Sequence, residues 1–118
     1  MHMLRIDNLT RNTTVIEQGR VADNFLTKFR GLMGVRHLPQ GDGLLITGCN
    51  SVHTHFMRIP IDVLYIDKHN RVVDIDPSMN AWRIGRARKS ASYVLEVPSG
   101  TAERTGCTVG DQLLISVA

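Results

Sequence analysis

The sequence predicts a mainly β fold, a sandwich or partly open barrel with one short N-terminal helix, formed by a single domain of residues 1–118. Short apolar runs follow one another with turn residues between them, a spacing typical of sandwiches and barrels. A helical periodicity stands out near the N-terminus. The four prolines fall at the margins of the apolar runs, where a missing N–H does least harm.

Two short β elements and a helix are predicted for the first third of the chain. Residues 1–6 are predicted to form an edge strand. β-Branched residues on both sides of the glycine-containing turn at 17–19 predict a hairpin. Apolar side chains then recur on one face over residues 22–33, which predicts a helix of about three turns. Asp23 is its expected N-cap, and Gly31 or Gly34 its expected end.

Beyond the helix, the apolar pattern predicts strands joined by short turns. Residues 67–70 are expected to form a hairpin loop, in which Asn70 tolerates a positive φ better than most residues. Residues 99–115 indicate a turn, one helical turn and a strand entry. The predicted strands are 43–47, 52–57, 61–67, 71–75, 93–97 and 112–117, and the predicted core comprises Phe25, Phe29, Leu32, Leu45, Val63, Tyr65, Val73, Leu95 and Leu113.

Composition and charge restrict the partners. A net charge of +3 permits an anionic ligand, but the lack of a second basic stripe argues against broad nucleic-acid binding. No apolar run approaches the ~20 residues of a membrane helix. The N-terminus shows no signal-peptide core, so we expect a cytoplasmic protein, with a missing upstream leader as the alternative. Cys49 and Cys107 are predicted to be free thiols, with a single bridge as the alternative.

Residues 49–67 hold the densest chemistry in the chain. A thiol, two histidines, an arginine and a carboxylate lie beside an apolar run, where polar groups must be paired or used. On a strand, His53 and His55 would share a face and could chelate a metal, with Cys49 or His37 as a third ligand. The shortness of the pair favours the alternative, hydrogen bonding near a strand end. No cofactor is therefore expected.

Two further positions have alternative interpretations. Asp62 interrupts an apolar run, so it either ties the turn at Pro60 or forms a general-base pair with His53. Trp82 lies among four cations in residues 81–89. That segment is either a solvated basic loop with the indole folded onto the core, or a surface where arginines and a stacking indole hold an anionic ligand.

From about residue 15 to residue 118, the chain resembles the small prokaryotic family catalogued as domain of unknown function number 192. The matching motifs, in order, are Arg30-Gly31-Leu32-Met33, Leu38-Pro39, Gly43-Leu44-Leu45, Ser51-Val52-His53-Thr54, Met57-Arg58, Pro60-Ile61-Asp62-Val63, Val72-Val73, Trp82, Leu95-Glu96-Val97, Gly100 and Gly110-Asp111. The resemblance implies a jelly-roll-like β-sandwich with one flanking helix. The family's activity is not established, so the resemblance does not indicate which reaction, if any, the chain catalyses. His55 and Phe56 stand where the family commonly has an aromatic residue and a glycine, so a metal site through His55 would not be shared.

Two functions of different classes follow from these residues. The preferred hypothesis is a binding or accessory module with a polar and aromatic groove for an anionic or peptide ligand. That ligand is expected to be a small molecule or part of a protein. Its predicted site residues are Arg30, His53, Met57, Arg58, Asp62 and Trp82. The alternative is a metal-dependent enzyme with Cys49, His53 and His55 as ligands, and a purely structural role for these residues is as plausible as that enzyme. A monomer or small homo-oligomer is expected.

Overall fold

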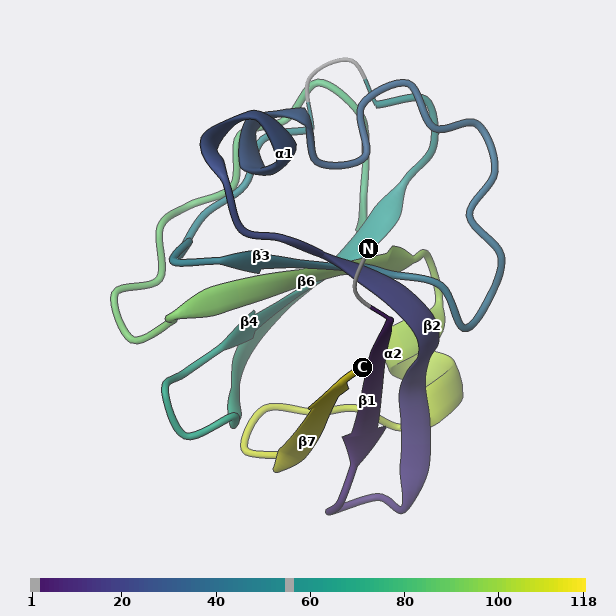
Figure 1. The fold of residues 1–118 in the computed structure, drawn as a ribbon, viewed down its shortest axis with the longest axis vertical. Coiled ribbons are helices and arrows are strands. Elements are labelled where there is room, and N and C mark those ends of the chain that lie inside the picture. Colours follow the sequence, from purple (N-terminus) through teal and green to yellow (C-terminus); the bar gives the residue numbers. More distant parts are fainter. Residues whose placement is uncertain (1–2, 55–56) are drawn as a thin grey trace.

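A single curled sheet accounts for most of the fold. The strands are β1 (Leu4–Asn8), β2 (Thr13–Ala22), β3 (Leu44–Thr47), β4 (Ile61–Ile66), β5 (Val72–Met79), β6 (Tyr93–Pro98) and β7 (Leu113–Val117), and the helices are α1 (Phe25–Arg30) and α2 (Thr101–Thr105). The computed structural model describes residues 3–54 and 57–118. Its sheet has seven strands in the order β5-β4-β6-β3-β2-β1-β7, bent round on itself as Figure 1 shows.

The two edges of the sheet approach each other and nearly close a barrel. The Val72 N–H donates to the Asp111 carbonyl over 2.9 Å, and the Leu113 N–H donates to the Asn70 carbonyl over 2.8 Å. Arg71 and Gln112 form an isolated antiparallel bridge between the same segments. The prediction of a mainly β fold with a partly open barrel is confirmed.

The N-terminal hairpin prediction is wrong, because β2 is one continuous strand of ten residues. Its residues 13–19 pair with β1, and its residues 20–22 pair in parallel with β3. Gly19 lies within the strand where β2 passes close to β3: a Cβ there would lie 2.8 Å from the Gly43 carbonyl oxygen. Gly19 therefore allows the close approach of two backbone segments and does not form a turn. Strand β1 also differs from prediction, since it pairs on both sides and is not an edge.

Helix α1 is shorter than the periodicity predicts. Its N-cap is Asn24, not Asp23, because Asn24 and Thr27 complete a reciprocal capping box. Gly31 ends the helix with a φ of 50°, as predicted for one of the two glycines. The chain turns there, so Leu32 enters the core while Phe29 stays 60% exposed. The core assignment of Phe29 is therefore wrong.

Most of the remaining predictions are confirmed in outline. Strands β3, β4, β5, β6 and β7 fall on predicted runs, and Asn70 has a φ of 63°. No strand forms over residues 52–54; His53 makes only an isolated bridge with Ile84. Val73 is half-buried, and the side chain of Phe25 lies outside the described part of the structure. Both cysteines are free thiols, as predicted.

The central strands separate two apolar clusters, one on each face. On β6, Leu95 and Val97 belong to the cluster under β1, β2 and β7, whereas Val94 belongs to the cluster on the other face, which includes Leu32. Because strand side chains alternate, Glu96 shares the face of Val94. This alternation decides which polar side chain reaches the candidate site.

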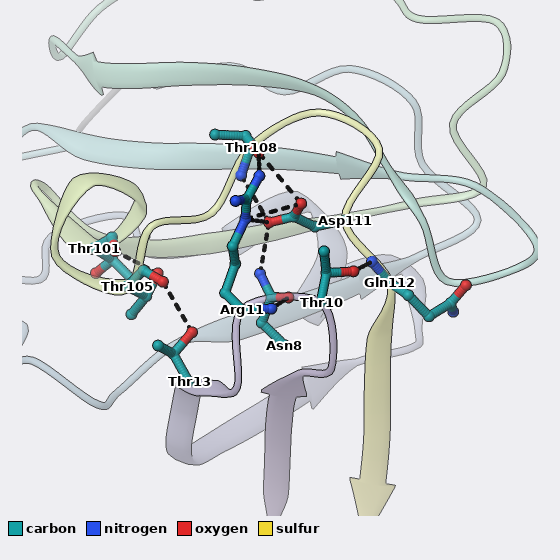
Figure 2. A network of polar contacts seen from close by, with 9 residues as sticks. All are labelled: Asn8, Thr10, Arg11, Thr13, Thr101, Thr105, Thr108, Asp111 and Gln112. Carbon is teal, nitrogen blue, oxygen red and sulfur yellow. Dashed lines mark hydrogen bonds and ion pairs between the residues drawn. The ribbon is translucent and has the colours of Figure 1, made fainter.

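A polar network ties the first loop to the C-terminal part of the chain (Figure 2). Asp111 is buried and accepts hydrogen bonds from the Asn8 amide, the Thr108 N–H and Arg11. Burial alone would raise the pKa of Asp111, but these donors hold it below its usual value. Thr13 extends the network by donating to the Thr105 carbonyl at the end of α2.

Candidate functional site

A pocket of about 490 Å³ lies between the C-terminal end of α1 and the loop that follows β3. Its wall is mainly apolar, and two cations, Lys28 and Arg30, belong to its lining. Apolar walls with a few polar groups are typical of small-molecule sites. The lining residues are Lys28, Phe29, Arg30, Gly31, Leu32, Met33, Ile46, Gly48, Cys49, Ser51, Val52, His53, Met57, Ile84 and Glu96.

Glu96 is the polar group buried most deeply among the residues that line this pocket. It lies on β6 between its register partners Leu44 of β3 and Val63 of β4, and it is 3% exposed. Its Oε1 atom has no hydrogen-bond partner among the described residues. Burial raises the pKa of this carboxyl to about 7. The sequence reasoning missed it, although a lone carboxylate within the apolar run 93–98 was a visible signal.

Three of the predicted site residues line the pocket: Arg30, His53 and Met57. Met57 is buried and His53 is half-buried. The His53 ring lies 5.7 Å from the Phe29 ring, centroid to centroid, and is tilted by 48°. The exposed Arg30 lies at the last position of α1. The structure therefore brings together a cation, an imidazole and a thioether from two separate segments.

Arg58 and Trp82 lie at a neighbouring hollow of about 430 Å³. Met33 and Met57 line both hollows, so the two are adjacent. Arg58 is exposed, and the Trp82 indole is 61% exposed and not folded onto the core. Together the two hollows form a surface that combines the predicted residues except Asp62.

Thr54 holds the loops around this surface in place. It is fully buried, and its hydroxyl donates to the Asn80 carbonyl over 2.6 Å and accepts from the Arg83 N–H over 2.7 Å. Its own carbonyl accepts from the Trp82 N–H over 2.8 Å. These contacts position His53 and Trp82 relative to each other, a role that the sequence motif did not reveal.

Within the basic segment 81–89, Arg88 has a structural contact that anchors the loop. Its guanidinium lies 3.9 Å from the Tyr65 ring centroid and forms ion pairs with Asp74 at 2.9 Å and Asp76 at 2.8 Å. The Tyr65 hydroxyl donates to Asp76 as well. Arg88 is thus engaged with β5 and adds little positive charge to the ligand surface.

Asp62 lies on the opposite face of the sheet from the pocket. Its register partner is Val97, and its two oxygens accept from the Ser78 N–H at 2.8 Å and the Ala102 N–H at 2.9 Å. Each oxygen of Asp62 thus accepts one backbone N–H, and the two bonds join β5 and α2 to β4. Asp62 therefore stabilises the fold, and it lies away from His53.

The metal candidates do not assemble within the described residues. Cys49 lines the pocket with His53, and its thiol hydrogen-bonds the Ser51 carbonyl. His37 is exposed on the loop after α1. In residues 3–54 and 57–118, no three His, Cys, Asp or Glu side chains form a group able to hold a metal ion. His55 lies outside these ranges.

The fold and site define a class: a small curled β-sheet domain with an apolar, cation-bearing pocket beside a short helix. The family model of DUF192, described as an uncharacterised ACR, matches residues 7–115. The chain belongs to this family, which confirms the resemblance of its motifs. In the described part of the chain, no helix has the length and apolar character to cross a membrane.

Relatives of the chain occur in archaea. A UPF0127 protein of Pyrococcus furiosus is 36% identical over 109 residues, which cover 90% of this chain and 93% of that protein. A UPF0127 protein of Thermococcus kodakarensis is 35% identical over 78% of this chain and 60% of its own length. The chain thus spans about three fifths of the latter.

Two solved structures share the fold. A Novosphingobium aromaticivorans protein of unknown function has a TM-score of 0.81 at 19% identity, covering 95% of this chain and 83% of the other. A Sinorhizobium meliloti protein described as a candidate transcription regulator has a TM-score of 0.82 at 22% identity, covering 96% and 92%. At these identities the likeness concerns the fold alone.

Proposed function

We propose that this chain is a ligand-binding domain whose pocket beside α1 holds a small molecule with an apolar body and an anionic group. The single observation that carries the proposal is the pocket of about 490 Å³, with apolar walls and with Lys28 and Arg30 in its lining. Its volume lies in the range of small-molecule sites.

The ligand's two parts match two parts of the pocket. The apolar body packs against Leu32, Val52 and Met57, which are buried side chains of the wall. The anionic group pairs with Arg30 and Lys28, because a guanidinium and an ammonium both donate to a carboxylate or phosphate. Neither cation forms an ion pair with another described residue.

Arg58 and Trp82 extend this surface past Met57. The exposed indole offers a face for stacking, and the exposed guanidinium offers a second place for an anionic group. A longer ligand, such as an extended peptide with an acidic side chain, would occupy both hollows. The smaller ligand needs only the first.

The test is titration of the protein with octanoate, followed by two-dimensional NMR of the backbone amides. We expect a Kd of about 1 mM, as for about ten heavy atoms at roughly 0.4 kcal/mol each. The shifted amides should be those of pocket residues. Neutralising both pocket cations, by Lys28→Gln with Arg30→Gln, should weaken binding several-fold and remove most of its salt dependence. Arg36→Gln, at an exposed cation that does not line the pocket, is the matched control.

A flat response of the pocket amides up to the solubility limit of octanoate would refute the proposal. So would an equal loss of affinity in the double variant and in the Arg36→Gln control, because charge at the pocket would then have no particular role.

A further inference from the structure

The buried carboxyl oxygen Oε1 of Glu96 takes no part in the hydrogen bonds that hold the described part of the fold together. Two other buried carboxylates in the chain have their oxygens used by the protein: Asp62 accepts two backbone N–H groups, and Asp111 accepts an amide, an N–H and a guanidinium. Glu96 Oε1 accepts nothing from the described residues. A buried polar group without a partner costs stability, so a donor supplied by a ligand would stabilise this oxygen.

No neighbouring charge in the described part of the chain offsets the desolvation of the Glu96 carboxyl. From β3 and β4 it faces the apolar side chains of Leu44 and Val63. The ionisable groups that share its pocket are Lys28 and Arg30 of α1 and Cys49 and His53 of the following loop. Burial is the cause that raises its pKa to about 7, so none of these groups offsets the desolvation. Near neutral pH the carboxyl is therefore substantially protonated.

Gly31 lies close to this carboxyl. Its φ of 50° and ψ of −125° are unfavourable for a side chain, and a Cβ there would lie 3.2 Å from Glu96 Oε1. The residue that ends α1 thus has no side chain at the point nearest the carboxyl. Gly31 and Glu96 both line the pocket, but Oε1 itself is fully buried, so a ligand reaches it only after a small displacement of the residues that cover it.

We propose that Glu96, as a neutral carboxyl, is the hydrogen-bonding anchor at the inner end of the pocket and selects a ligand with an amide or similar carbonyl group there. This inference deepens the proposed function and rests on it. A protonated carboxyl offers one O–H donor and one carbonyl acceptor, which match the C=O and N–H of a primary amide. The ligand class is then an anion with an apolar middle and an amide at its far end.

A ligand with an ammonium group at the far end is the main competitor. It would form an ion pair with ionised Glu96, but two charges would then be buried in an apolar pocket at considerable desolvation cost. Lys28 and Arg30 line the same pocket and would repel the ammonium. The neutral hydrogen-bonded pair avoids both costs.

Three probes of matched length separate these cases by NMR titration. Adipamate carries a carboxylate and a terminal amide, 6-methylheptanoate replaces that amide with an isopropyl group of the same shape, and 6-aminohexanoate carries an ammonium. At pH 6 we expect adipamate to bind about tenfold more tightly than 6-methylheptanoate, since one or two hydrogen bonds are worth roughly 1.4 kcal/mol. Homologues of the three probes that are two carbons longer test the case in which Glu96 lies further from the pocket cations.

The pH dependence gives an independent reading. If only the protonated carboxyl binds adipamate, the Kd for adipamate should rise about tenfold from pH 6 to pH 8. Glu96→Gln keeps a donor and an acceptor of the same shape but cannot ionise, so it should bind adipamate with a flat pH profile. Glu96→Leu should bind adipamate no better than 6-methylheptanoate. Retained binding by Glu96→Gln also shows that the variant is folded.

The outcomes distinguish the anchor from the pocket itself. Equal affinities for adipamate and 6-methylheptanoate, measured from the backbone amides of pocket residues, would overturn the role of Glu96 and leave the proposed function standing. Preference for 6-aminohexanoate that grows with pH and disappears in Glu96→Gln would overturn the neutral-carboxyl proposal. Failure of all three probes, and of octanoate, to shift any pocket amide would overturn both.

Discussion

Replacing Glu96 with glutamine should make the protein more stable, and the gain should grow with pH. The unfolded chain releases the Glu96 proton near pH 4.5, whereas burial in the folded protein raises the pKa to about 7. Between these values the folded state holds a proton that the unfolded state has lost. The free energy of unfolding therefore falls as pH rises through this window and levels off above it.

The magnitude follows from the two pKa values. Each pH unit between 4.5 and about 7 lowers stability by about 1.4 kcal/mol, so the total is about 3 kcal/mol. Glutamine has the same shape and no proton to lose. The stability difference between Glu96→Gln and the parent should therefore increase by about 3 kcal/mol from pH 4 to pH 8.

The assay is urea unfolding at half-unit pH steps, monitored by far-UV circular dichroism, for the parent, Glu96→Gln and Glu103→Gln. Glu103 is an exposed glutamate on α2, so its variant reports the pH response that all the proteins share. A stability difference for Glu96→Gln that stays constant from pH 4 to pH 8 would refute the reasoning. It would mean that the carboxyl is solvated or paired with a cation in the folded protein.

Three further outcomes test the supports of the site and the fold. Thr54→Val should lower the free energy of unfolding by about 2 kcal/mol, because the Arg83 N–H loses its partner; an unchanged urea midpoint would contradict this. Asp111→Ala should lower the free energy of unfolding by at least about 2 kcal/mol at pH 7 and by less below pH 4. The pKa of this carboxyl is lowered in the folded protein, so its stabilising contribution is present above the unfolded pKa and is lost as the pH falls. Chemical denaturation at pH 3 and pH 7 measures both values. Gly31→Ala should lower stability by about 1–3 kcal/mol through backbone strain and crowd Glu96; a thermal midpoint equal to that of the parent would count against the strained geometry.

The sequence predicted the sheet well because strand formation is encoded locally. Apolar runs bounded by turn residues placed β3, β4, β5, β6 and β7 within a few residues of their observed bounds. The continuous course of β2 was not predicted, because a glycine in a polar stretch has the same local pattern in a turn and in a close strand crossing. Only the approach of the Gly43 carbonyl distinguishes the two.

Helix α1 shows a similar limit. The periodicity of its apolar residues predicted a buried face, yet Leu26 is 75% exposed and Phe29 lies at the pocket. Helix α1 has only six residues, and the chain turns at Gly31 before Leu32 enters the core. The sequence allowed that turn at either of two glycines.

For the candidate site, the sequence by itself determined where the chemistry lies along the chain but not which groups meet. It indicated Arg30, His53 and Met57, which do line one pocket. Asp62 and Glu96 are both lone carboxylates in apolar strands, and nothing local separates them. Register places Asp62 beside Val97 on the face covered by α2, where the backbone N–H groups of Ser78 and Ala102 meet it, and places Glu96 on the face where α1 leaves a pocket. The tertiary structure decided that difference, because burial and hydrogen bonding depend on segments distant in sequence.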